Sequence, residues 1–258
     1  MGPRLPVLFV SHGSPMNALS TNAYTQHLKG LGETLPRPSS ILVVSAHWQT
    51  SGSRVLKVER PKQIYDFYGF PRELHEIRYE PTGAPEVAED VKRALQNHGA
   101  ASDDTWGLDH GTWTVLHHMY PKADIPVFQL SLDRNLNLQG HLDLARDLRG
   151  FRERGVLILG SGNITHNLRE VDFGPSPRPM DWAVEFDEMI KDSLLNKNIA
   201  QLLARDPSKH ALWRRAHPTL EHYVPLLYAV GASLANEHPQ FPHEEIQHGS
   251  LSMRSVMY

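Results

Sequence analysis

The residues of this sequence that could do chemistry are its histidines, and three of them follow apolar segments. His12 and His47 come directly after VLFVS and ILVVSA, and His166 lies about six residues beyond GVLILG. The chain holds 16 histidines among 258 residues and no cysteine, so any metal must be held by nitrogen and oxygen. Neutral imidazoles at one place suit zinc, iron, copper or nickel, whereas magnesium and calcium prefer oxygen ligands. The histidines therefore indicate a candidate metal site.

A fourth histidine, His222, lies in HPTLEHYVPLLY, which we expect to form a helix across the same place. The long spacing between His12, His47 and His222 matches no short zinc-binding motif, so it does not define a reaction. For each of these histidines alone, an ordinary structural residue is the more common explanation. His217 and Glu221 also compete with His222 for any functional role. The spacing therefore leaves the ligand set open.

The segment WGLDHGTWTVLHH has a second group of polar and aromatic residues. It places Asp109 and His110 at the start of a predicted helix, close to Trp106 and Trp113. One interpretation is an aspartate cap packed by aromatic rings. The other interpretation is a polar group beside an aromatic-walled pocket, and the spacing does not choose between the two.

Several classes of protein are disfavoured by the sequence. GSGNITHN lacks the lysine of a phosphate-binding P-loop, and LGSGN is not the G-x-S-x-G turn of a serine hydrolase. The net charge is −3 with no basic run, which disfavours nucleic-acid binding. The longest apolar runs are strand-sized, far short of the roughly 20 residues of a membrane span. The N-terminus lacks a secretory signal pattern, so we expect a cytoplasmic protein.

The positions of the histidines depend on the elements that precede them. Four apolar runs are nearly continuous, which is typical of strands buried on both faces, whereas 250–257 alternates and predicts a half-exposed strand. Helix-patterned segments separate the strands and no linker divides the chain. This favours a single α/β domain over residues 1–258, with a mainly parallel central sheet covered by helices on both faces. The predicted strands are 6–11, 41–46, 53–58, 126–131, 155–160 and 250–257, and the predicted helices are 82–99, 109–120, 137–149, 181–195 and 217–232.

This architecture brings the histidines together. In open α/β sheets, ligands bind beyond the carboxyl ends of the strands, where the loops converge. His12, His47 and His166 each follow such an end, so all three can reach one crevice. Small residues flank two of them, in SHGS and SAHW, and permit a close approach to a bound group.

Seven ordered motifs together resemble a known family. They are SHGSPMNAL, VVSAHW, YDFYGFPRELHEIRYEPTGAPEVA, WGLDHGTWTVLHHMYP, PVFQLSLD, GSGNITHNL and EHYVPLLYAVGA. These motifs are similar to those of the class III, LigB-like extradiol ring-cleavage dioxygenases, and they match the DOPA 4,5-dioxygenase-like branch particularly well. The resemblance covers about residues 6–258.

The resemblance implies a mononuclear non-haem Fe(II) site, with Zn(II) as an alternative metal in isolated proteins. His12, His47 and His222 match the family's metal ligands. His166 matches an active-site histidine that acts as acid or base, with a role as a fourth ligand left open, and His110 matches a histidine near the substrate. Better-known members of the wider superfamily use a carboxylate as third ligand, so Glu221, beside His222, keeps that assignment open.

The segment 63–79, QIYDFYGFPRELHEIRY, is rich in aromatic and charged residues. We expect it to form a loop over the mouth of the site that recognises substrate through Tyr65, Tyr68 or Arg78. A surface loop packed by its own aromatic rings is the alternative.

The resemblance implies an enzyme that uses O2 to open a catechol ring next to its two hydroxyls. A hydrolase with zinc-bound hydroxide on the same histidines is one alternative, and a non-catalytic binding protein of the same fold is the other. The expected partners are a small catechol and O2, with neither nucleic acid nor a membrane. We expect a monomer or a small homo-oligomer.

Overall fold

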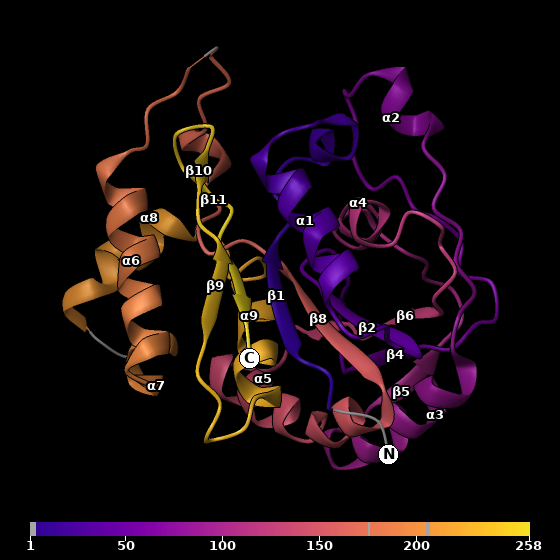
Figure 1. The fold of residues 1–258 in the computed structure, drawn as a ribbon. Coiled ribbons are helices and arrows are strands. Elements are labelled where there is room, and N and C mark those ends of the chain that lie inside the picture. Colours follow the sequence, from indigo (N-terminus) through magenta and orange to yellow (C-terminus); the bar gives the residue numbers. More distant parts are fainter. Residues whose placement is uncertain (1–3, 175, 205–206) are drawn as a thin grey trace.

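A six-stranded mixed sheet forms the centre of the molecule (Figure 1). The computed structural model describes residues 4–174, 176–204 and 207–258. The sheet order is β6-β2-β8-β1-β12-β9. The first four strands are parallel, β12 pairs antiparallel with β1, and β9 pairs antiparallel with β12. The strands are β1 (Val7–Ser11), β2 (Ser40–Ser45), β6 (Val127–Gln129), β8 (Val156–Gly162), β9 (Gln240–His243) and β12 (Ser255–Met257).

Helices cover both faces of this sheet, as the sequence predicts. Alternate residues of a strand point to opposite faces, so Leu8 packs with α1 (Ala23–Thr34) and α4 (His110–Met119) in one hydrophobic cluster. Phe9 packs with α5 (Leu138–Arg146) and α9 (Val224–Ala232) in the other cluster. Two apolar faces explain why the parallel strands are continuous apolar runs in the sequence.

Further helices surround these layers. In Figure 1, α6, α7 and α8 lie beyond β9, at the side of the sheet away from β6. None of the helices within the described ranges is long and apolar enough to cross a membrane. The remaining helices are η1 (Pro15–Leu19), α2 (Arg72–Glu76), α3 (Pro85–Ala94), η2 (Gln96–His98), η3 (Arg149–Arg154), η4 (Leu168–Glu170), α6 (Asp181–Leu195), α7 (Ile199–Leu202), η5 (Pro207–Lys209) and α8 (His210–Ala216).

Two predicted strands differ from the structure. The predicted strand 53–58 is only β4 (Arg54–Leu56), which pairs with β5 (Ala101–Asp103) outside the central sheet. The predicted strand 250–257 is two pieces, β11 (Leu251–Ser252) and β12. The other short strands are β3 (Gln49–Thr50), β7 (Leu132–Asp133) and β10 (Ile246–Gln247), which pair as β3-β7 and β10-β11.

The C-terminal segment is buried, so its predicted half-exposure is wrong. Residues 251–256 are all buried, including the polar positions of the alternating pattern. Those polar side chains have partners inside the protein: Ser255 Oγ lies 3.1 Å from His27 Nε2, and Arg254 pairs with Asp187. An alternating pattern indicates exposure only where the polar side chains meet water, and here they meet other polar side chains.

The predicted helices exist, but two begin later than expected. The helix predicted at 82–99 begins at Pro85, and that predicted at 217–232 begins at Val224. In both cases proline is in the first turn, where its fixed φ and missing N–H are tolerated. Residues 217–223 therefore form an irregular segment, which approaches the central sheet as backbone rather than as a helix.

Candidate metal centre

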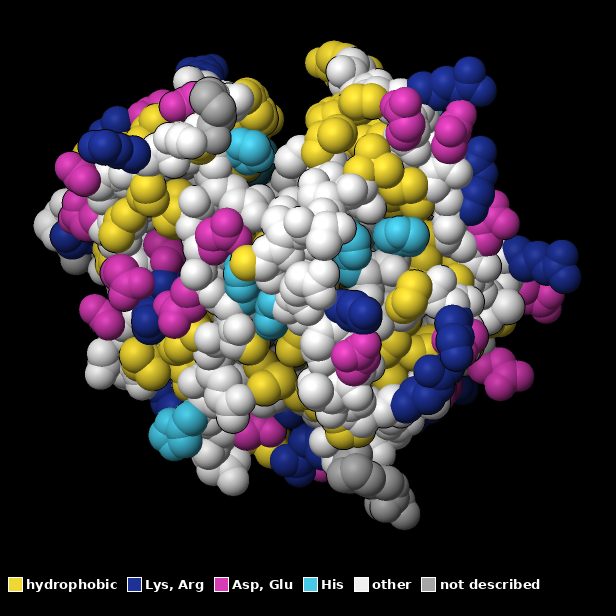
Figure 2. Space-filling view, turned by 45° about the horizontal axis from the view of Figure 1, so that its top comes forward, with side chains coloured by type: hydrophobic (Ala, Val, Ile, Leu, Met, Phe, Trp, Pro, Cys, Tyr) yellow, Lys and Arg dark blue, Asp and Glu magenta, His cyan; other side chains and the backbone are white. Residues whose placement is uncertain are grey.

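The carboxyl ends of three neighbouring parallel strands supply the predicted site residues. His12 follows β1, His47 lies two residues beyond β2, and His166 lies four residues beyond β8. His222 comes from the irregular segment before α9. In Figure 2 this end of the molecule is turned forward, and a notch separates the lobe that carries β10 and β11 from the lobe that carries α2.

Glycines allow these segments to approach one another. Gly13 has φ +63°, in the left-handed region that favours glycine, and a Cβ there would lie 2.7 Å from Met253 Sδ. At the end of β8, a Cβ on Gly162 would collide with the backbone carbonyl of His222. The small residues beside the histidines therefore permit contact between protein segments.

Three imidazoles converge. One ring nitrogen from each of His12, His47 and His222 lies within 4.8 Å of the other two. The Nε2 atoms of His12 and His47 are 3.1 Å apart. Two nitrogens bound to one ion at ~2.0–2.1 Å in a tetrahedral arrangement are about 3.3 Å apart, so this separation suits ligands of one ion. The donor set fits a transition metal.

Outer hydrogen bonds orient two of these imidazoles. Ser161 Oγ donates its hydrogen to the carbonyl of Gly111 at 2.5 Å, so it can only accept from His12 Nδ1, at 2.9 Å. His222 Nδ1 donates to Glu221 Oε1 at 3.1 Å. A protonated Nδ1 leaves the lone pair on Nε2, which is the tautomer that binds a metal. Ser161 was not among the residues predicted from the sequence, although it belongs to the GSGNITHN motif.

Burial keeps the three imidazoles neutral. Burial first, and then the neighbouring histidines, hold the pKa values of His12 and His222 well below the usual 6.5. For His47, burial and the adjacent His110 lower the pKa to about 3, against an opposing effect of Asp66. Neutral imidazoles keep the lone pairs that a metal requires.

His166 lies directly against His222. The rings of the two residues are stacked, with centroids 3.4 Å apart and 7° between the planes. His166 and His222 form a second potential ligand group with Glu221, and this group shares only His222 with the group that contains His12 and His47. Burial lowers the pKa of His166 to about 4, although Glu221 opposes this shift. This histidine is thus neutral and able to accept a proton.

His110 approaches the cluster from the start of α4. Its ring centroid is 3.9 Å from that of His47 and 5.5 Å from that of His12. Asp66, which was not predicted from the sequence, lies close to both histidines: its carboxylate oxygens are 3.0 Å from His110 Nδ1 and 3.6 Å from His47 Nδ1. Burial raises the pKa of Asp66, but the contacts with His110 and His47 outweigh it and lower the pKa overall.

Asp109 does not cap α4 with its side chain, in contrast to one interpretation of the sequence. Its carboxylate is fully buried and accepts hydrogen bonds from Ser45 Oγ at 2.6 Å and Gln129 Nε2 at 2.9 Å. Burial, and then the nearby Asp66, raise the pKa of Asp109. Because Ser45 ends β2 and Gln129 ends β6, Asp109 ties the start of α4 to the carboxyl edge of the sheet.

The segment 63–79 supplies an aromatic wall next to His110. The Phe67 and His110 ring centroids are 5.6 Å apart, and Phe67 also contacts Trp113. Tyr68 is 93% exposed on the surface of the molecule. Arg78 Nη1 donates to the Tyr65 hydroxyl and, at 2.7 Å, to the carbonyl of His75. Contact of Tyr68 or Arg78 with a substrate stays a prediction.

These features define a class of protein. The sheet is an open α/β sheet, and the site at its carboxyl edge combines converging neutral imidazoles with an aromatic wall. Such a constellation belongs to a metal-dependent α/β enzyme rather than to a nucleotide-binding protein.

Comparison with known proteins identifies the family. A family model described as "Catalytic LigB subunit of aromatic ring-opening dioxygenase" matches residues 6–256. The chain therefore belongs to the LigB family of aromatic ring-opening dioxygenases, which makes it an oxidoreductase. This confirms the resemblance drawn from the seven motifs.

Individual relatives agree with this assignment. The chain is 43% identical to "4,5-DOPA dioxygenase extradiol" of Escherichia coli (strain K12), over 98% of this chain and 94% of the relative. It is 36% identical to the protein of the same name from Beta vulgaris, over 97% of this chain and 95% of the relative. A crystal structure of an uncharacterised Escherichia coli K12 protein superposes with a TM-score of 0.86 at 39% identity, over 98% and 99% of the two chains. The predicted branch and the predicted fold are thereby confirmed.

Proposed function

We propose that this protein is an Fe(II)-dependent extradiol dioxygenase that inserts both atoms of O2 into a DOPA-like catechol and opens the ring beside its hydroxyls. The observation that carries the proposal is the convergence of His12, His47 and His222 at the carboxyl edge of the sheet. The family favours this reaction over the hydrolase and the binding protein considered from the sequence. A catechol and O2 are the proposed partners.

His12, His47 and His222 would hold the metal. Bound iron supplies the redox chemistry that O2 requires and acidifies the hydroxyls of a catechol, whereas zinc has no redox chemistry. Ser161 and Glu221 keep the Nε2 lone pairs of two of these imidazoles available. The role of Glu221 in this proposal is therefore to orient His222.

His166 and His110 would handle protons and charge. His166 is buried, neutral and stacked on His222, so it can accept a proton from a catechol hydroxyl. His110 lies between His47 and Phe67, where its imidazole N–H can donate a hydrogen bond to a catechol oxygen that gains charge. The Asp66 carboxylate, 3.0 Å from His110 Nδ1, would orient this ring by its charge.

The segment 63–79 would form one wall of the catechol site. Phe67 and Trp113 offer flat apolar surfaces of the kind that accommodate an aromatic ring. Arg78 carries a positive charge that suits the carboxylate of a DOPA-like substrate. Tyr68 could reach a bound substrate only if the segment closes over the site, because the side chain is exposed.

An oxygen-uptake assay tests this proposal. The protein is loaded anaerobically with Fe(II), mixed with DOPA or caffeate, and exposed to air. We expect O2 consumption together with a yellow ring-opened product, and neither with protein loaded with Zn(II). The matched variant His47→Ala should abolish both signals. Failure of the Fe(II)-loaded wild-type protein to consume O2 with any simple catechol would refute the proposal.

A further inference from the structure

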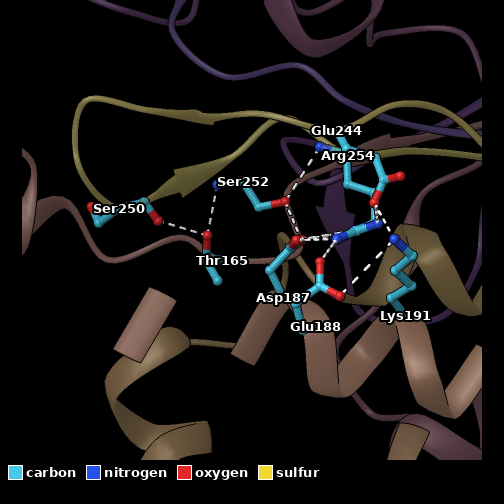
Figure 3. A network of polar contacts seen from close by, with 8 residues as sticks. All are labelled: Thr165, Asp187, Glu188, Lys191, Glu244, Ser250, Ser252 and Arg254. Atoms are coloured by element: carbon cyan, nitrogen blue, oxygen red, sulfur yellow. Dashed lines mark hydrogen bonds and ion pairs between the residues drawn. The ribbon is translucent and has the colours of Figure 1, made fainter. Parts of the chain in front are cut away.

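A C-terminal segment that carries none of the proposed ligands is attached to the loop that holds His166. We call Ser250–Arg254 the C-terminal brace. Thr165, the neighbour of His166, donates a hydrogen bond from its hydroxyl to the carbonyl of Ser250 at 2.6 Å. The same hydroxyl accepts from the backbone N–H of Ser252 at 2.7 Å. Figure 3 shows Thr165 between these two residues, and all three are fully buried.

Asn163 connects the brace to two more histidines. Its side-chain amide donates to the carbonyl of Ser252 at 3.0 Å and accepts from the backbone N–H of Gly13 at 3.3 Å. Its backbone N–H donates to the carbonyl of His222 at 2.8 Å. Asn163 is fully buried, so each of these bonds has no water to replace it. The brace is therefore hydrogen-bonded to the loop that carries His166 and, through Asn163, connected to the segments that carry His12 and His222.

A buried charge network attaches the brace to α6. Arg254 is 1% exposed, and its Nε lies 3.0 and 3.1 Å from the two carboxylate oxygens of Asp187 on α6. Its guanidinium also donates to Glu188 at 2.6 Å and to Glu244. Ser252 Oγ donates to Asp187 at 2.6 Å, so Arg254 and the Ser252 side chain share one carboxylate (Figure 3).

Stability alone does not explain such a network. Removing charges from water costs so much that well-packed apolar residues of the same size are often equally or more stabilising than a buried ion pair. What an ion pair with several directed hydrogen bonds adds is a single geometry. Hydrogen bonds connect Asp187 to Ser252 and Ser252 to Thr165, so the position of Asp187 constrains the loop of His166.

We propose that the C-terminal brace is a positioning element of the metal centre, and that Arg254, Thr165 and Asn163 are its positioning residues. The brace holds the segments of His12, His166 and His222 in the relative placement that binds the ion and presents the base. Its effect on turnover depends on the proposed dioxygenase function, whereas its effect on metal affinity does not.

The first test substitutes Thr165. Thr165→Val keeps the shape and removes the hydroxyl, whereas Thr165→Ser keeps the hydroxyl and removes a methyl group. We expect Thr165→Val to lower kcat about tenfold or more, the size typical of lost support around a metal site, with little change in KM. Thr165→Ser should retain most of the wild-type kcat, although it too loses buried contacts. Equal kcat values for the two variants would overturn the proposal.

The second test needs no turnover. Arg254→Lys replaces the forked guanidinium by a single point charge. The matched control is Arg152→Lys, because Arg152 is also 1% exposed and contacts both carboxylate oxygens of Glu237 at 2.7 Å. Arg152 precedes β8 and bonds the carbonyl of Leu5, so it lies at the amino edge of the sheet, opposite the site.

Zinc affinity, measured by competition with a chelator, and the melting temperature are compared for these two variants. Both should melt at lower temperature, but only Arg254→Lys should bind Zn(II) more weakly, by about tenfold. Equal Zn(II) affinities would show that the brace is merely structural and overturn the inference. If the wild-type protein shows no catechol-dependent O2 uptake, the proposed function is refuted. Weaker Zn(II) binding by Arg254→Lys would in that case still support the brace.

Discussion

The imidazole of His166 lies flat against that of His222, with 3.4 Å between the ring centroids and 7° between the planes. Glu221 hydrogen-bonds His222 and belongs with it and His166 to one group of potential ligand atoms, whereas His12 and His47 belong with His222 to another group. His222 is therefore the proposed ligand that is in direct contact with the proposed base. Two predictions depend on this arrangement.

Replacement of His166 should separate proton transfer from metal binding. We expect His166→Phe, which keeps an aromatic plane against His222, to retain full metal content and to lower kcat about a hundredfold or more, because general acid–base catalysis contributes on the order of 10²–10⁴. Metal analysis and O2 uptake are the measurements. His222→Ala is the comparison variant and should lose the metal. Loss of metal from His166→Phe as well would make His166 a ligand.

Replacement of Glu221 should weaken metal binding without abolishing it. In Glu221→Gln the acceptor of the His222 Nδ1 hydrogen loses its charge, which makes the imidazole a weaker ligand, and we expect the Zn(II) affinity to fall about tenfold. The control is Glu245→Gln, because Glu245 lies 3.1 Å from His243 Nε2 in a comparable pair outside the cluster. Complete loss of metal from Glu221→Gln, with retention in His222→Ala, would instead make Glu221 the third ligand.

The sequence predicted the central part of the fold because the parallel strands are buried on both faces. Burial on both faces produces continuous apolar runs, and helices between them leave few arrangements open. The predictions failed where tertiary contacts replaced water. Ser252 and Arg254 are polar residues in an alternating pattern, yet Asp187 makes their burial favourable.

The convergence of the histidines was predictable for a similar reason. Carboxyl ends of parallel strands lie at the same edge of a sheet, so His12 and His47 were expected at one edge, and only β8 separates their strands. The contacts that orient them were not predictable. Asp66 comes from an irregular segment with no periodicity, and only the folded chain brings it to His110 and His47. Its position between aromatic residues in IYDFYG was the one signal available.

Removal of the Asp66 charge should impair turnover rather than metal binding. The carboxylate lies 3.0 Å from His110 Nδ1 and also accepts from the backbone N–H of His110 at 2.9 Å. In Asp66→Asn, His110 loses the anion that orients its ring, and we expect kcat to fall about tenfold to a hundredfold at full metal content. Steady-state O2 uptake and metal analysis are the measurements.

The matched control for Asp66→Asn is Glu73→Gln. It makes the same change of charge at an exposed position in α2, which lies in the same segment. We expect wild-type kcat for this control. Equal effects of the two substitutions would show that the charge of the segment as a whole, and not the contact with His110, matters.

Acid should destabilise the fold partly through a histidine remote from the metal centre. His141 on α5 is buried, and its Nδ1 lies 3.1 Å from the Tyr228 hydroxyl on α9. Burial lowers its pKa to about 4, against an opposing effect of Asp133. Between pH 6.5 and 4 the unfolded chain, with an ordinary histidine pKa of about 6.5, binds the proton and the folded chain does not. The stabilisation is therefore complete above pH 6.5 and is lost as the pH falls towards 4.

Substitution of His141 should remove this contribution to the pH dependence of stability. We expect the difference in the free energy of unfolding between wild type and His141→Gln to shrink by about 2 kcal/mol from pH 7 to pH 5, because only the wild type loses stability through this group. Urea denaturation of both proteins at the two pH values measures it. Leu144→Ala, which removes a buried side chain from the same helix without a titratable group, should show the same difference at both pH values. A His141→Gln difference that is as constant as that of Leu144→Ala would mean that His141 does not contribute to acid sensitivity.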